Sequence, residues 1–428
     1  MKIAFFVAEF PVLSETFVIR QVAGMVRAGH QVTVIAGQWG DRGLTHASYR
    51  ENGLEQCVRP VRTDDGGAGA RAACIASFLL RAPFSRQGRR ALLMALRGLV
   101  GGSPATLLDL ASLAGQGSLG RFDAIVAHFG PAGVRAMWLQ KAGYLQGPLA
   151  TVFHGFDVSD ARTLRRLGGA YRCLFAHGAR FLPISRLWRE RLVSWGAPAA
   201  RTLVLRMGVD ADQLTMGDPA RLAGRPLRAL SVARFTEKKG LRYAIEGVCG
   251  ASREVHYQII GDGPLVGELK QLAAQAPPGT HIEFLGRRSQ QEVFEALERA
   301  DLFLLPSVTA AGGDMEGVPV ALMEAMAKGI IVLATRHSGI PELVTEGVSG
   351  YLAEERSAGE IARAIDALPA EAEALSRLRL AARATIEAEF DNRLLDRQLE
   401  RILAEMAAAW REAETRVAQA PVADAGLP

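Results

Sequence analysis

The amino-acid sequence predicts an α/β protein built from two Rossmann-like, doubly wound domains that face each other across a ligand-binding cleft. In two separate regions, short β-branched strands alternate with amphipathic helices, which favours parallel sheets. A polar segment that contains Gly and Pro, about 208–226, separates these regions as a linker, and 428 residues suffice for two or three domains. Ligands of such sheets bind beyond the carboxyl ends of the strands, so the expected site is the cleft between the domains.

Residues 1–207 form the first predicted domain, which opens with a buried strand over Ile3–Ala8. Ser14 is expected to cap a helix that continues to about Arg27, because its hydroxyl can accept from the first free N–H groups. Residues 61–120 are predicted to be mostly helical, with Gly-rich breaks. The later strands are predicted at Gln31–Ala36, Asp123–Ala127, Leu149–Phe153, Phe181–Ile184 and Leu203–Leu205.

The second predicted domain spans residues 227–390 and repeats the alternation of strand and helix. A helix over 391–412 is expected to pack back toward the first domain, and the Ala- and Pro-bearing tail 413–428 is expected to be disordered. The strands of this domain are predicted at Leu227–Ala233, Val255–Ile260, Ile282–Leu285, Asp301–Leu305 and Ile330–Ala334. Its first helices are predicted at Leu241–Val248, Leu265–Ala274, Gln290–Arg299 and Pro319–Lys328.

The net charge of +5 conceals a strong asymmetry along the chain. Residues 1–210 carry 26 Lys and Arg against 13 Asp and Glu, whereas residues 211–428 carry 24 against 32. Between residues 66 and 108, six Arg interleave with apolar runs and no acid occurs, which suits peripheral contact with an anionic membrane surface. A solvated basic face on packed helices is the alternative. Nucleic acid is not expected as a partner, because the sequence has no reader motif or interleaved stacking aromatics.

Cysteine usage and hydropathy indicate the cellular compartment of the protein. The four Cys residues are scattered without a CxxC pair, which argues against a zinc site or a disulfide scaffold and favours a reducing environment. No apolar run approaches 18 residues, so no membrane span is expected. The sequence therefore predicts a cytoplasmic protein held peripherally at the inner face of the membrane.

Two glutamates, Glu316 and Glu324, lie eight positions apart with Pro319 between them. Pro319 is predicted to be the first helical residue, because proline has a preset φ and no N–H to lose there. Glu316 then lies in the preceding loop, and Glu324 lies inside a helix that is apolar almost all round. A carboxylate buried in such a helix needs a partner. From spacing alone, that partner is either a protein donor such as an arginine or a polyhydroxylated ligand.

Further polar residues of the second domain follow predicted strand ends, where a doubly wound sheet places its ligands. Arg234 and Lys239 follow the first strand and open onto a helix N-terminus, which suits a phosphate or diphosphate. Solvated charges on a surface turn are the alternative. Gly261 and Gly263 form a tight turn after the next strand, where backbone can approach a ligand.

The start of the Glu324 helix can also hold an anion through its free N–H groups and its dipole. The residues at this start are Gly317, Val318 and Pro319. Cations for a diphosphate, carboxylates for hydroxyls and backbone turns for a base together indicate a nucleotide sugar as ligand. No metal is expected, because Arg234 and Lys239 are available to neutralise the diphosphate.

On these residues, the chain resembles family 4 glycosyltransferases of the two-domain GT-B architecture over almost its whole length. The most specific marker is the paired-glutamate segment with its flanks, Pro306-Ser307 and Glu316-x7-Glu324-Ala325. A further marker is Ser338-Gly339-Ile340-Pro341-Glu342. The first domain is similar to the subgroup that builds bacterial exopolysaccharides, such as the colanic acid transferases. The segments that match are Phe10-Pro11-Val12-Leu13-Ser14-Glu15, His128-Phe129-Gly130, Phe153-His154-Gly155-Phe156-Asp157 and Met207-Gly208-Val209-Asp210.

The resemblance implies retaining transfer of a hexose from a nucleotide-diphosphate sugar, without an essential metal or other cofactor. Glu316 is implied to hold donor-sugar hydroxyls and to stabilise the developing oxocarbenium, and Glu324 to bind the ribose hydroxyls. Arg234 and Lys239 are implied to neutralise the diphosphate, and His154 to contact the donor sugar near the anomeric centre. The implied acceptor is a polyprenyl-diphosphate-linked oligosaccharide. A UDP-sugar is favoured as donor on family frequency.

Three alternatives remain at the level of sequence. The donor could be of the GDP-mannose type. The protein could be a GT-B sugar-nucleotide epimerase or hydrolase, or a non-catalytic nucleotide-sugar-binding partner in a polysaccharide assembly complex. A Rossmann dehydrogenase is disfavoured, because the sequence has no G-x-G-x-x-G fingerprint in the required place.

Overall fold

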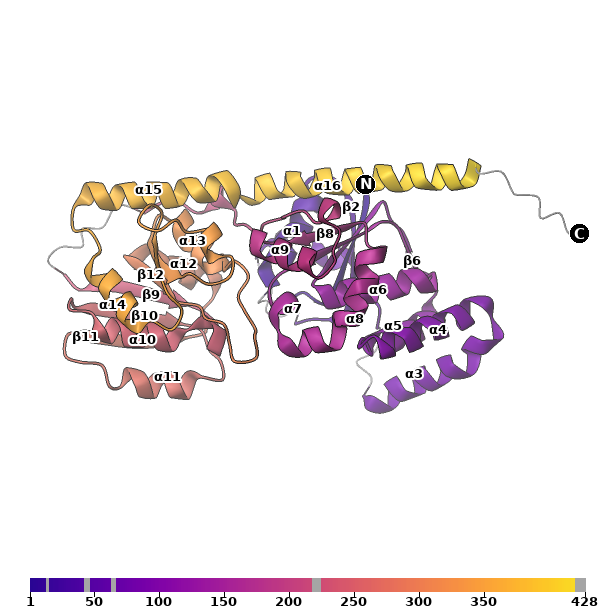
Figure 1. Ribbon diagram of the computed structural model, residues 1–428, viewed down its shortest axis with the longest axis horizontal. Helices are drawn as coiled ribbons and strands as arrows, with labels where there is room; N and C mark the ends of the chain where they lie inside the picture. The colour runs from indigo at the N-terminus through magenta and orange to yellow at the C-terminus, as the bar shows by residue number, and fades with distance from the viewer. Residues whose placement is uncertain (13–14, 42–46, 63–66, 218–224, 420–428) are drawn as a thin grey trace, which may run out of the picture.

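The computed structural model describes residues 1–12, 15–41, 47–62, 67–217 and 225–419. Two domains lie side by side along its long axis, and each is built round a six-stranded parallel sheet with helices on its faces (Figure 1). The predicted fold class, α/β with two Rossmann-like domains, is confirmed. No helix in these described ranges has the length and apolar character needed to span a bilayer.

The first sheet has the strand order β3-β2-β1-β5-β7-β8, and every neighbouring pair is parallel. Its order reverses between β1 and β5, the point at which a doubly wound sheet opens a crevice at the carboxyl ends of its strands. The strands are β1 (Lys2–Phe10), β2 (Gln31–Trp39), β3 (Val58–Pro60), β5 (Ala124–His128), β7 (Leu149–Phe153) and β8 (Arg180–Pro183). A separate two-stranded pair consists of β4 (Gly120–Arg121) and β6 (Leu145–Gln146).

Helices cover both faces of this sheet, as the alternating pattern predicts. The predicted helical stretch 61–120 contains three helices that project from one end of the molecule (Figure 1). The helices are α1 (Thr16–Arg27), α2 (Ala47–Glu51), α3 (Ala68–Arg81), α4 (Arg86–Val100), α5 (Ala105–Gln116), α6 (Gly130–Ala142), α7 (Phe156–Ser159), α8 (Ala161–His177) and α9 (Arg186–Ser194). Ser14, the predicted cap of α1, lies outside the described residues.

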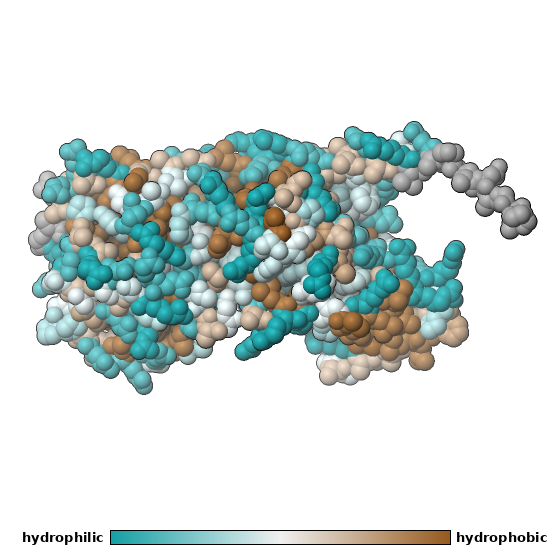
Figure 2. All heavy atoms as spheres, in the orientation of Figure 1, coloured by the Kyte–Doolittle hydropathy of each residue, from teal (hydrophilic) through white to brown (hydrophobic). Residues whose placement is uncertain are grey.

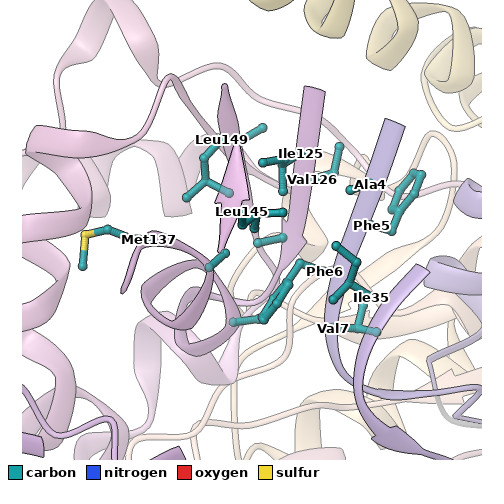
Figure 3. Packing of buried hydrophobic residues seen from close by; sticks show 14 of the residues in the cluster. Ala4, Phe5, Phe6, Val7, Ile35, Ile125, Val126, Met137, Leu145 and Leu149 are labelled. Carbon is teal, nitrogen blue, oxygen red and sulfur yellow. The ribbon is translucent and has the colours of Figure 1, made fainter. Parts of the chain in front are cut away.

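The core of the first domain lies on both faces of its central strands. Phe5 and Phe6 of β1 are both fully buried although they point to opposite faces, because helices cover each side of the sheet. Apolar side chains of β1, β2, β5 and β7 gather with Met137 of α6 in this core (Figure 3). Such double burial explains why these strands are continuous apolar runs in the sequence.

The second sheet repeats the topology of the first, with the order β11-β10-β9-β12-β13-β14 and parallel pairing throughout. Its order reverses between β9 and β12. The strands are β9 (Leu227–Val232), β10 (Val255–Ile260), β11 (Thr280–Gly286), β12 (Leu302–Leu305), β13 (Ile331–Thr335) and β14 (Tyr351–Ala353). The helices are α10 (Leu241–Gly250), α11 (Val266–Ala273), α12 (Gln290–Arg299), α13 (Val320–Ala327), α14 (Ala358–Asp366), α15 (Ala372–Glu389) and α16 (Asn392–Gln419).

Two expected elements differ in the structure. The predicted strand Leu203–Leu205 is extended chain beside β8, where Leu203 N–H and Leu205 N–H donate to Phe181 O and Pro183 O, but only one isolated bridge forms. Pro319 is the cap residue of α13 and not its first helical residue, because its ψ of 123° is extended. The prediction that Glu316 precedes this helix and that Glu324 lies within it is confirmed.

The end of the chain also differs from its prediction, because α16 continues to Gln419 and residues 413–419 are helical. Ion pairs of this end with the first domain help to explain the extension: Arg411 pairs with Asp123 at 3.9 Å, and Glu414 pairs with Arg121. Residues 420–428 of the predicted tail lie outside the described residues.

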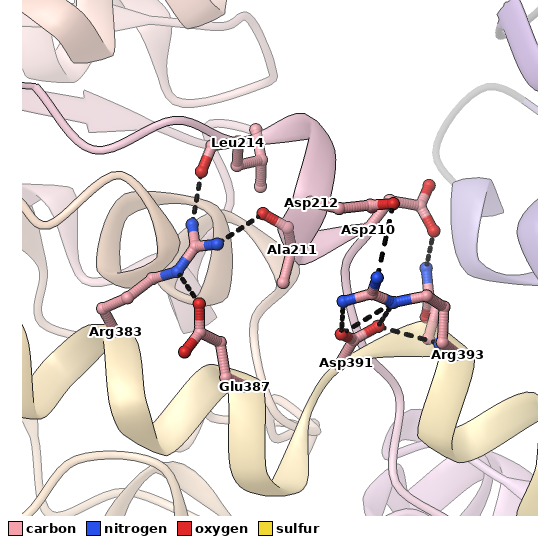
Figure 4. A network of polar contacts seen from close by, with 9 residues as sticks. Asp210, Ala211, Asp212, Leu214, Arg383, Glu387, Asp391 and Arg393 are labelled. Atoms are coloured by element: carbon pink, nitrogen blue, oxygen red, sulfur yellow. Dashed lines mark hydrogen bonds and ion pairs between the residues drawn. The ribbon is translucent and has the colours of Figure 1, made fainter.

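Helices α15 and α16 run along one side of both domains (Figure 1). Helix α16 packs against α1, and four of its side chains, Leu399, Ile402, Leu403 and Met406, join the first-domain core. The chain therefore crosses between the domains twice, and the two crossings are bonded to each other. Val209 N–H donates to Phe390 O at 2.9 Å and Asn392 N–H donates to Val209 O at 3.0 Å. Polar contacts stabilise these crossings: Arg383 donates to Ala211 O, and Arg393 pairs with Asp212 and Asp391 (Figure 4).

Candidate active site

Glu316 and Lys239 meet where the order of the second sheet reverses. Lys239 lies in a short 3-10 turn after β9, Glu316 lies in the loop after β12, and β9 and β12 are neighbours in the sheet. The Lys239 Nζ is 2.7 Å from Glu316 Oε2. A second cation, Lys238, approaches Glu316 Oε1 at 3.6 Å and Asp314 at 3.1 Å. The structure thus joins two of the predicted catalytic residues at the point where this topology places a ligand.

The two lysines set the charge of the Glu316 carboxyl group. Burial by itself would raise the pKa of Glu316, but the charges of Lys239 and Lys238 outweigh it and hold this pKa below its ordinary value. The side chain is only 8% exposed. Glu316 therefore presents a permanent negative charge in a site that excludes most water, where electrostatic interactions are strong.

Glu324 is paired across the domain interface. Its carboxylate lies 3.6 Å from an Arg20 Nη2 on α1 of the first domain. Arg20 is also 3.8 Å from Asp210, and its Nε and Nη1 have no hydrogen-bond partner among the described residues. Burial raises the pKa of Glu324 above its ordinary value, although Arg20 lowers it. Arg20 is thus a protein partner for Glu324, one of the two kinds of partner that the sequence left open. Because Arg20 makes one contact with the Glu324 carboxylate, the carboxylate can still accept further hydrogen bonds.

His154 lies at the carboxyl end of β7, as predicted, but its ring is enclosed by the first domain. The Nε2 atom is 3.1 Å from His128 Nδ1, and the Nδ1 atom is 3.3 Å from Met207 Sδ. The ring also makes tilted contacts with Phe17 and Phe129, each with centroids 4.5 Å apart. Burial lowers the pKa of His154 well below its ordinary value, so the imidazole is neutral. In this arrangement both ring nitrogens serve first-domain partners, and the donor contact of His154 stays a prediction.

The backbone at His154 touches the second domain. A Cβ at Gly317 would lie only 2.2 Å from His154 O, so glycine is required for this approach. Nearby, Met315 N–H donates to Ser159 Oγ at 3.0 Å and Ala161 N–H donates to Gly312 O at 3.0 Å. The loop that carries Glu316 therefore lies directly against the carboxyl ends of the first sheet.

Arg234, Gly261 and Gly263 belong to one pair of packed loops. A Cβ at Gly261 would meet Ala233 O at 1.8 Å, and one at Gly263 would meet Phe235 O at 2.6 Å. Both glycines are thus required by the close packing of the loops after β9 and β10. Arg234, between these contacts, is exposed and has no ion-pair partner in the described part of the chain.

Val318 and Pro319 anchor the start of α13 in the second-domain core. Val318 is buried in the apolar cluster of this domain, and Pro319 O accepts from Leu322 N–H at 3.1 Å. Sequence reasoning missed two residues of the site, Arg20 and His337. His337 is the second residue after β13, so the strand-end rule could have found it. Nothing distinguishes Arg20 from other arginines of an amphipathic helix. In the described ranges, no cluster of three His, Cys, Asp or Glu is arranged to hold a metal ion.

Comparisons with known proteins agree with this geometry. The family described as glycosyl transferases group 1 matches residues 218–385, and the glycosyl transferase 4-like domain matches residues 14–208. WcaL of Escherichia coli, whose name gives colanic acid biosynthesis glycosyltransferase as an unproven role, is 39% identical over 409 residues. The match covers 94% of this chain and 99% of WcaL. The amylovoran biosynthesis glycosyltransferase AmsK of Erwinia amylovora is 39% identical over 412 residues, which cover 95% and 100% of the two chains.

Among solved structures, Anabaena HepE in complex with UDP and glucose superimposes with a TM-score of 0.66 at 18% identity. The match covers 95% of this chain and all of HepE, so it extends the likeness of fold over both domains. The predicted resemblance is confirmed: the chain belongs to the group 1 glycosyl transferases and has the GT-B fold, and its first domain is a glycosyl transferase 4-like domain.

Proposed function

We propose that the protein is a retaining glycosyltransferase that moves a hexose from a nucleotide-diphosphate sugar, with a UDP-sugar as the favoured donor, to a lipid-linked oligosaccharide. The observation that carries this proposal is the Lys239–Glu316 pair at the reversal point of the second sheet, 2.7 Å apart and next to the first domain. The likeness to WcaL and AmsK, named for colanic acid and amylovoran biosynthesis, supports a role in bacterial exopolysaccharide synthesis. The HepE complex with UDP and glucose supports a UDP-sugar.

In this mechanism the enzyme supplies charge and position and no covalent nucleophile. Glu316, kept ionised by its lysines, faces the positive charge that develops on the sugar as its bond to the diphosphate breaks. Lys239 and Arg234 neutralise the leaving diphosphate, which takes the proton of the acceptor hydroxyl on the same face of the sugar. Glu324 accepts from the ribose hydroxyls with the capacity that Arg20 leaves unused. No metal is required by this scheme.

The acceptor is proposed to reach the enzyme from the inner face of the cytoplasmic membrane. Seven of the twelve large hydrophobic side chains that are exposed in the described part of the chain lie between residues 79 and 100, on α3, α4 and the turn that joins them. They form a broad apolar area at one end of the first domain (Figure 2). The arginines of this hairpin are exposed as well, namely Arg71, Arg81, Arg86, Arg89, Arg90 and Arg97. Apolar and basic side chains together suit an anionic bilayer surface.

Donor choice can be tested with a thermal-shift panel of UDP-, GDP- and ADP-sugars. A ligand that binds only the folded state raises the unfolding temperature by mass action, so the true donor should produce the largest shift. A GDP-sugar that stabilises the protein more than any UDP-sugar would replace the favoured donor with the GDP-mannose type. Conversion of the donor without any acceptor would identify an epimerase or hydrolase, and binding without turnover over many acceptors would identify a non-catalytic partner.

The catalytic assignments predict the behaviour of three alanine variants. Glu316→Ala, Lys239→Ala and His154→Ala should each lower turnover at least about tenfold, because each removes charge or position at the reacting sugar. Steady-state transfer with the donor found in the panel measures this loss, and circular dichroism checks the fold. Exposed His281 on the far edge strand β11 offers the matched control, and His281→Ala should transfer at the wild-type rate. Wild-type turnover in all three site variants would overturn these assignments.

A further inference from the structure

Both backbone groups of Glu316 are held by His337 and Ser338, the second and third residues after β13. Glu316 N–H donates to His337 Nε2 at 3.0 Å, and Ser338 Oγ donates to Glu316 O at 2.6 Å. His337 is fully buried. The place of the Glu316 backbone therefore depends on a neighbouring strand end, whereas its carboxylate is held separately by the lysines after β9.

The hydrogen bonds of His337 define its tautomer. Because an N–H group points at Nε2, this nitrogen must accept, and the ring proton must reside on Nδ1. The Nδ1 atom lies 2.6 Å from Glu355 Oε1, just after β14. Glu355 is fixed in turn by Thr309, after β12, whose N–H and Oγ1 lie 2.8 Å and 3.2 Å from its carboxylate oxygens. A continuous polar chain thus runs from Thr309 through Glu355 and His337 to Glu316.

Each member of this chain has a role that an apolar side chain could not fill. Although burial raises the pKa of Glu355, bonds from Thr309 and His337 outweigh it, so the pKa is lowered and the carboxylate accepts in ionised form. Both ring nitrogens of His337 are engaged, so the imidazole is not available to a substrate. A carboxylate that orients a histidine, which then holds a third group, is the arrangement that fixes ligands in metal and acid–base sites.

We propose that His337, oriented by Glu355, is a positioning residue for sugar transfer: it sets the location of the Glu316 carboxylate without touching the sugar. This inference rests on the proposed function, in which Glu316 faces the reacting sugar. Displacement of a catalytic group by about 1 Å can cost on the order of a hundredfold in rate, so the backbone bond at Glu316 is expected to control turnover.

Two substitutions separate the two bonds of the ring. In His337→Gln the amide oxygen reaches the place of Nε2 and can accept from Glu316 N–H. In His337→Asn the shorter amide reaches only the place of Nδ1 and can donate only to Glu355. We expect His337→Asn to lower kcat at least about tenfold. His337→Gln should recover at least about threefold of this loss, because it restores the bond to Glu316.

The binding of free UDP supplies the readout that separates positioning from folding. UDP lacks the hexose that is transferred, so its Kd from calorimetry should be unchanged in His337→Asn while kcat falls. In a Glu316→Ala background, His337→Asn should cost no further activity, since its effect passes through Glu316. Glu355→Gln provides a second variant if His337→Asn unfolds, and it should lower kcat with the same unchanged Kd for UDP. His281→Asn, on the exposed edge strand, is the control and should keep wild-type kcat.

The outcomes are distinct. Wild-type kcat in His337→Asn, or an equal loss of kcat and of UDP binding in the Asn and Gln variants, would overturn the positioning role and leave the proposed function standing. A wild-type enzyme that transfers no sugar from any donor would overturn the proposed function and this inference with it.

Discussion

Glu316 and Glu324 lie in opposite electrostatic surroundings although one helix start separates them. Two lysines hold the pKa of Glu316 below its ordinary value, whereas burial raises that of Glu324, opposite Arg20 at 3.6 Å. A carboxylate with a lowered pKa suits a permanent countercharge for an oxocarbenium. One with a raised pKa lacks full compensation and gains most from new hydrogen-bond donors such as hydroxyl groups. The two local environments therefore agree with two different roles.

Asp396 on α16 carries a buried charge that destabilises the fold at neutral pH. Burial raises its pKa to about 7, and the charges of Asp210 and Asp391 add to this effect while Arg27 opposes it. The stability that the protonated group provides is complete below its unfolded pKa, about 4, and is lost as pH rises to about 7. Asp396→Asn should therefore raise the unfolding temperature at pH 8 and leave it nearly unchanged at pH 4, with an upper limit of roughly 4 kcal/mol.

Thermal unfolding of wild type and Asp396→Asn across pH 4 to 8 measures this difference. The control is Asp212→Asn, since Asp212 is 52% exposed and no buried charge is removed there. Equal gains for Asp396→Asn at pH 4 and pH 8 would contradict the titration argument, because a gain from packing or helix propensity does not depend on pH.

At single residues, the sequence predicted the site residues that follow strand ends. It did not predict those whose partners lie far away in the chain. Glu316 and Lys239 were predictable, because the reversal of strand order brings the ends of β9 and β12 together. Arg20 was not, since its partner Glu324 is more than 300 residues away in the chain and belongs to the other domain. The enclosure of His154 by His128 and Met207 depends on side-chain packing that no local pattern encodes.

At the scale of elements, one helix of the first domain is capped by the second. The N-terminus of α9 donates two backbone N–H groups, from Arg186 and Leu187, to Glu342 Oε1 at 2.8 Å and 3.2 Å. The other oxygen of Glu342 pairs with Arg206 at 2.9 Å. A carboxylate at a helix N-terminus is favoured by the free N–H groups and by the dipole. Glu342 of the second domain therefore joins the two domains through these contacts with Arg186, Leu187 and Arg206, which together are called the Glu342 latch.

Removal of this latch should loosen the domain arrangement. Glu342→Ala leaves Arg206 without one partner and the N–H groups of Arg186 and Leu187 without their acceptor, which should cost roughly 2–4 kcal/mol of interdomain contact. We expect a lower unfolding temperature and, by small-angle X-ray scattering, a larger radius of gyration without ligand. Glu373→Ala is the control, because Glu373 is 86% exposed and pairs only with Arg377 of its own helix in the described part of the chain. A compact, unchanged Glu342→Ala protein would rule out the latch.

Long, strongly patterned elements were predictable, and short ones were decided by their neighbours. The central strands and the helices after them follow from apolar runs and helical periodicity. Leu203–Leu205 has the composition of a strand, but it pairs only along β8 and forms no continuous ladder. The last turns of α16 depend on Asp123 and Arg121 of the first domain, so the Ala-rich sequence alone suggested too early an end.

At the scale of the whole molecule, charge and apolar surface agree on one orientation. Residues 1–210 carry a large excess of positive charge and residues 211–428 an excess of negative charge, so an anionic bilayer attracts the first domain and repels the second. The exposed apolar area on α3 and α4 lies in the attracted half (Figure 2). Docking through this hairpin would leave the second domain, with the proposed donor site, directed away from the bilayer.

This orientation predicts that membrane binding depends on the hairpin. Leu80, Phe84 and Val100 are 72%, 87% and 91% exposed, so their replacement by serine removes apolar contact at little cost to the fold. The triple variant Leu80→Ser, Phe84→Ser, Val100→Ser should lose most of its co-flotation with vesicles that contain phosphatidylglycerol. Arg86→Glu with Arg89→Glu and Arg90→Glu should abolish the preference for anionic over neutral vesicles, because these arginines supply the electrostatic attraction.

The matched control lies in the other domain. Leu380 on α15 is 57% exposed, so Leu380→Ser removes a comparable side chain from the half that the bilayer should repel, and its flotation should equal that of wild type. Transfer to a water-soluble acceptor should also be unchanged in the triple variant, since α3 and α4 lie at the end of the molecule opposite the second domain (Figure 1). Equal flotation of the triple variant and wild type, or wild-type protein that ignores anionic vesicles, would show that the basic apolar hairpin faces something other than a membrane.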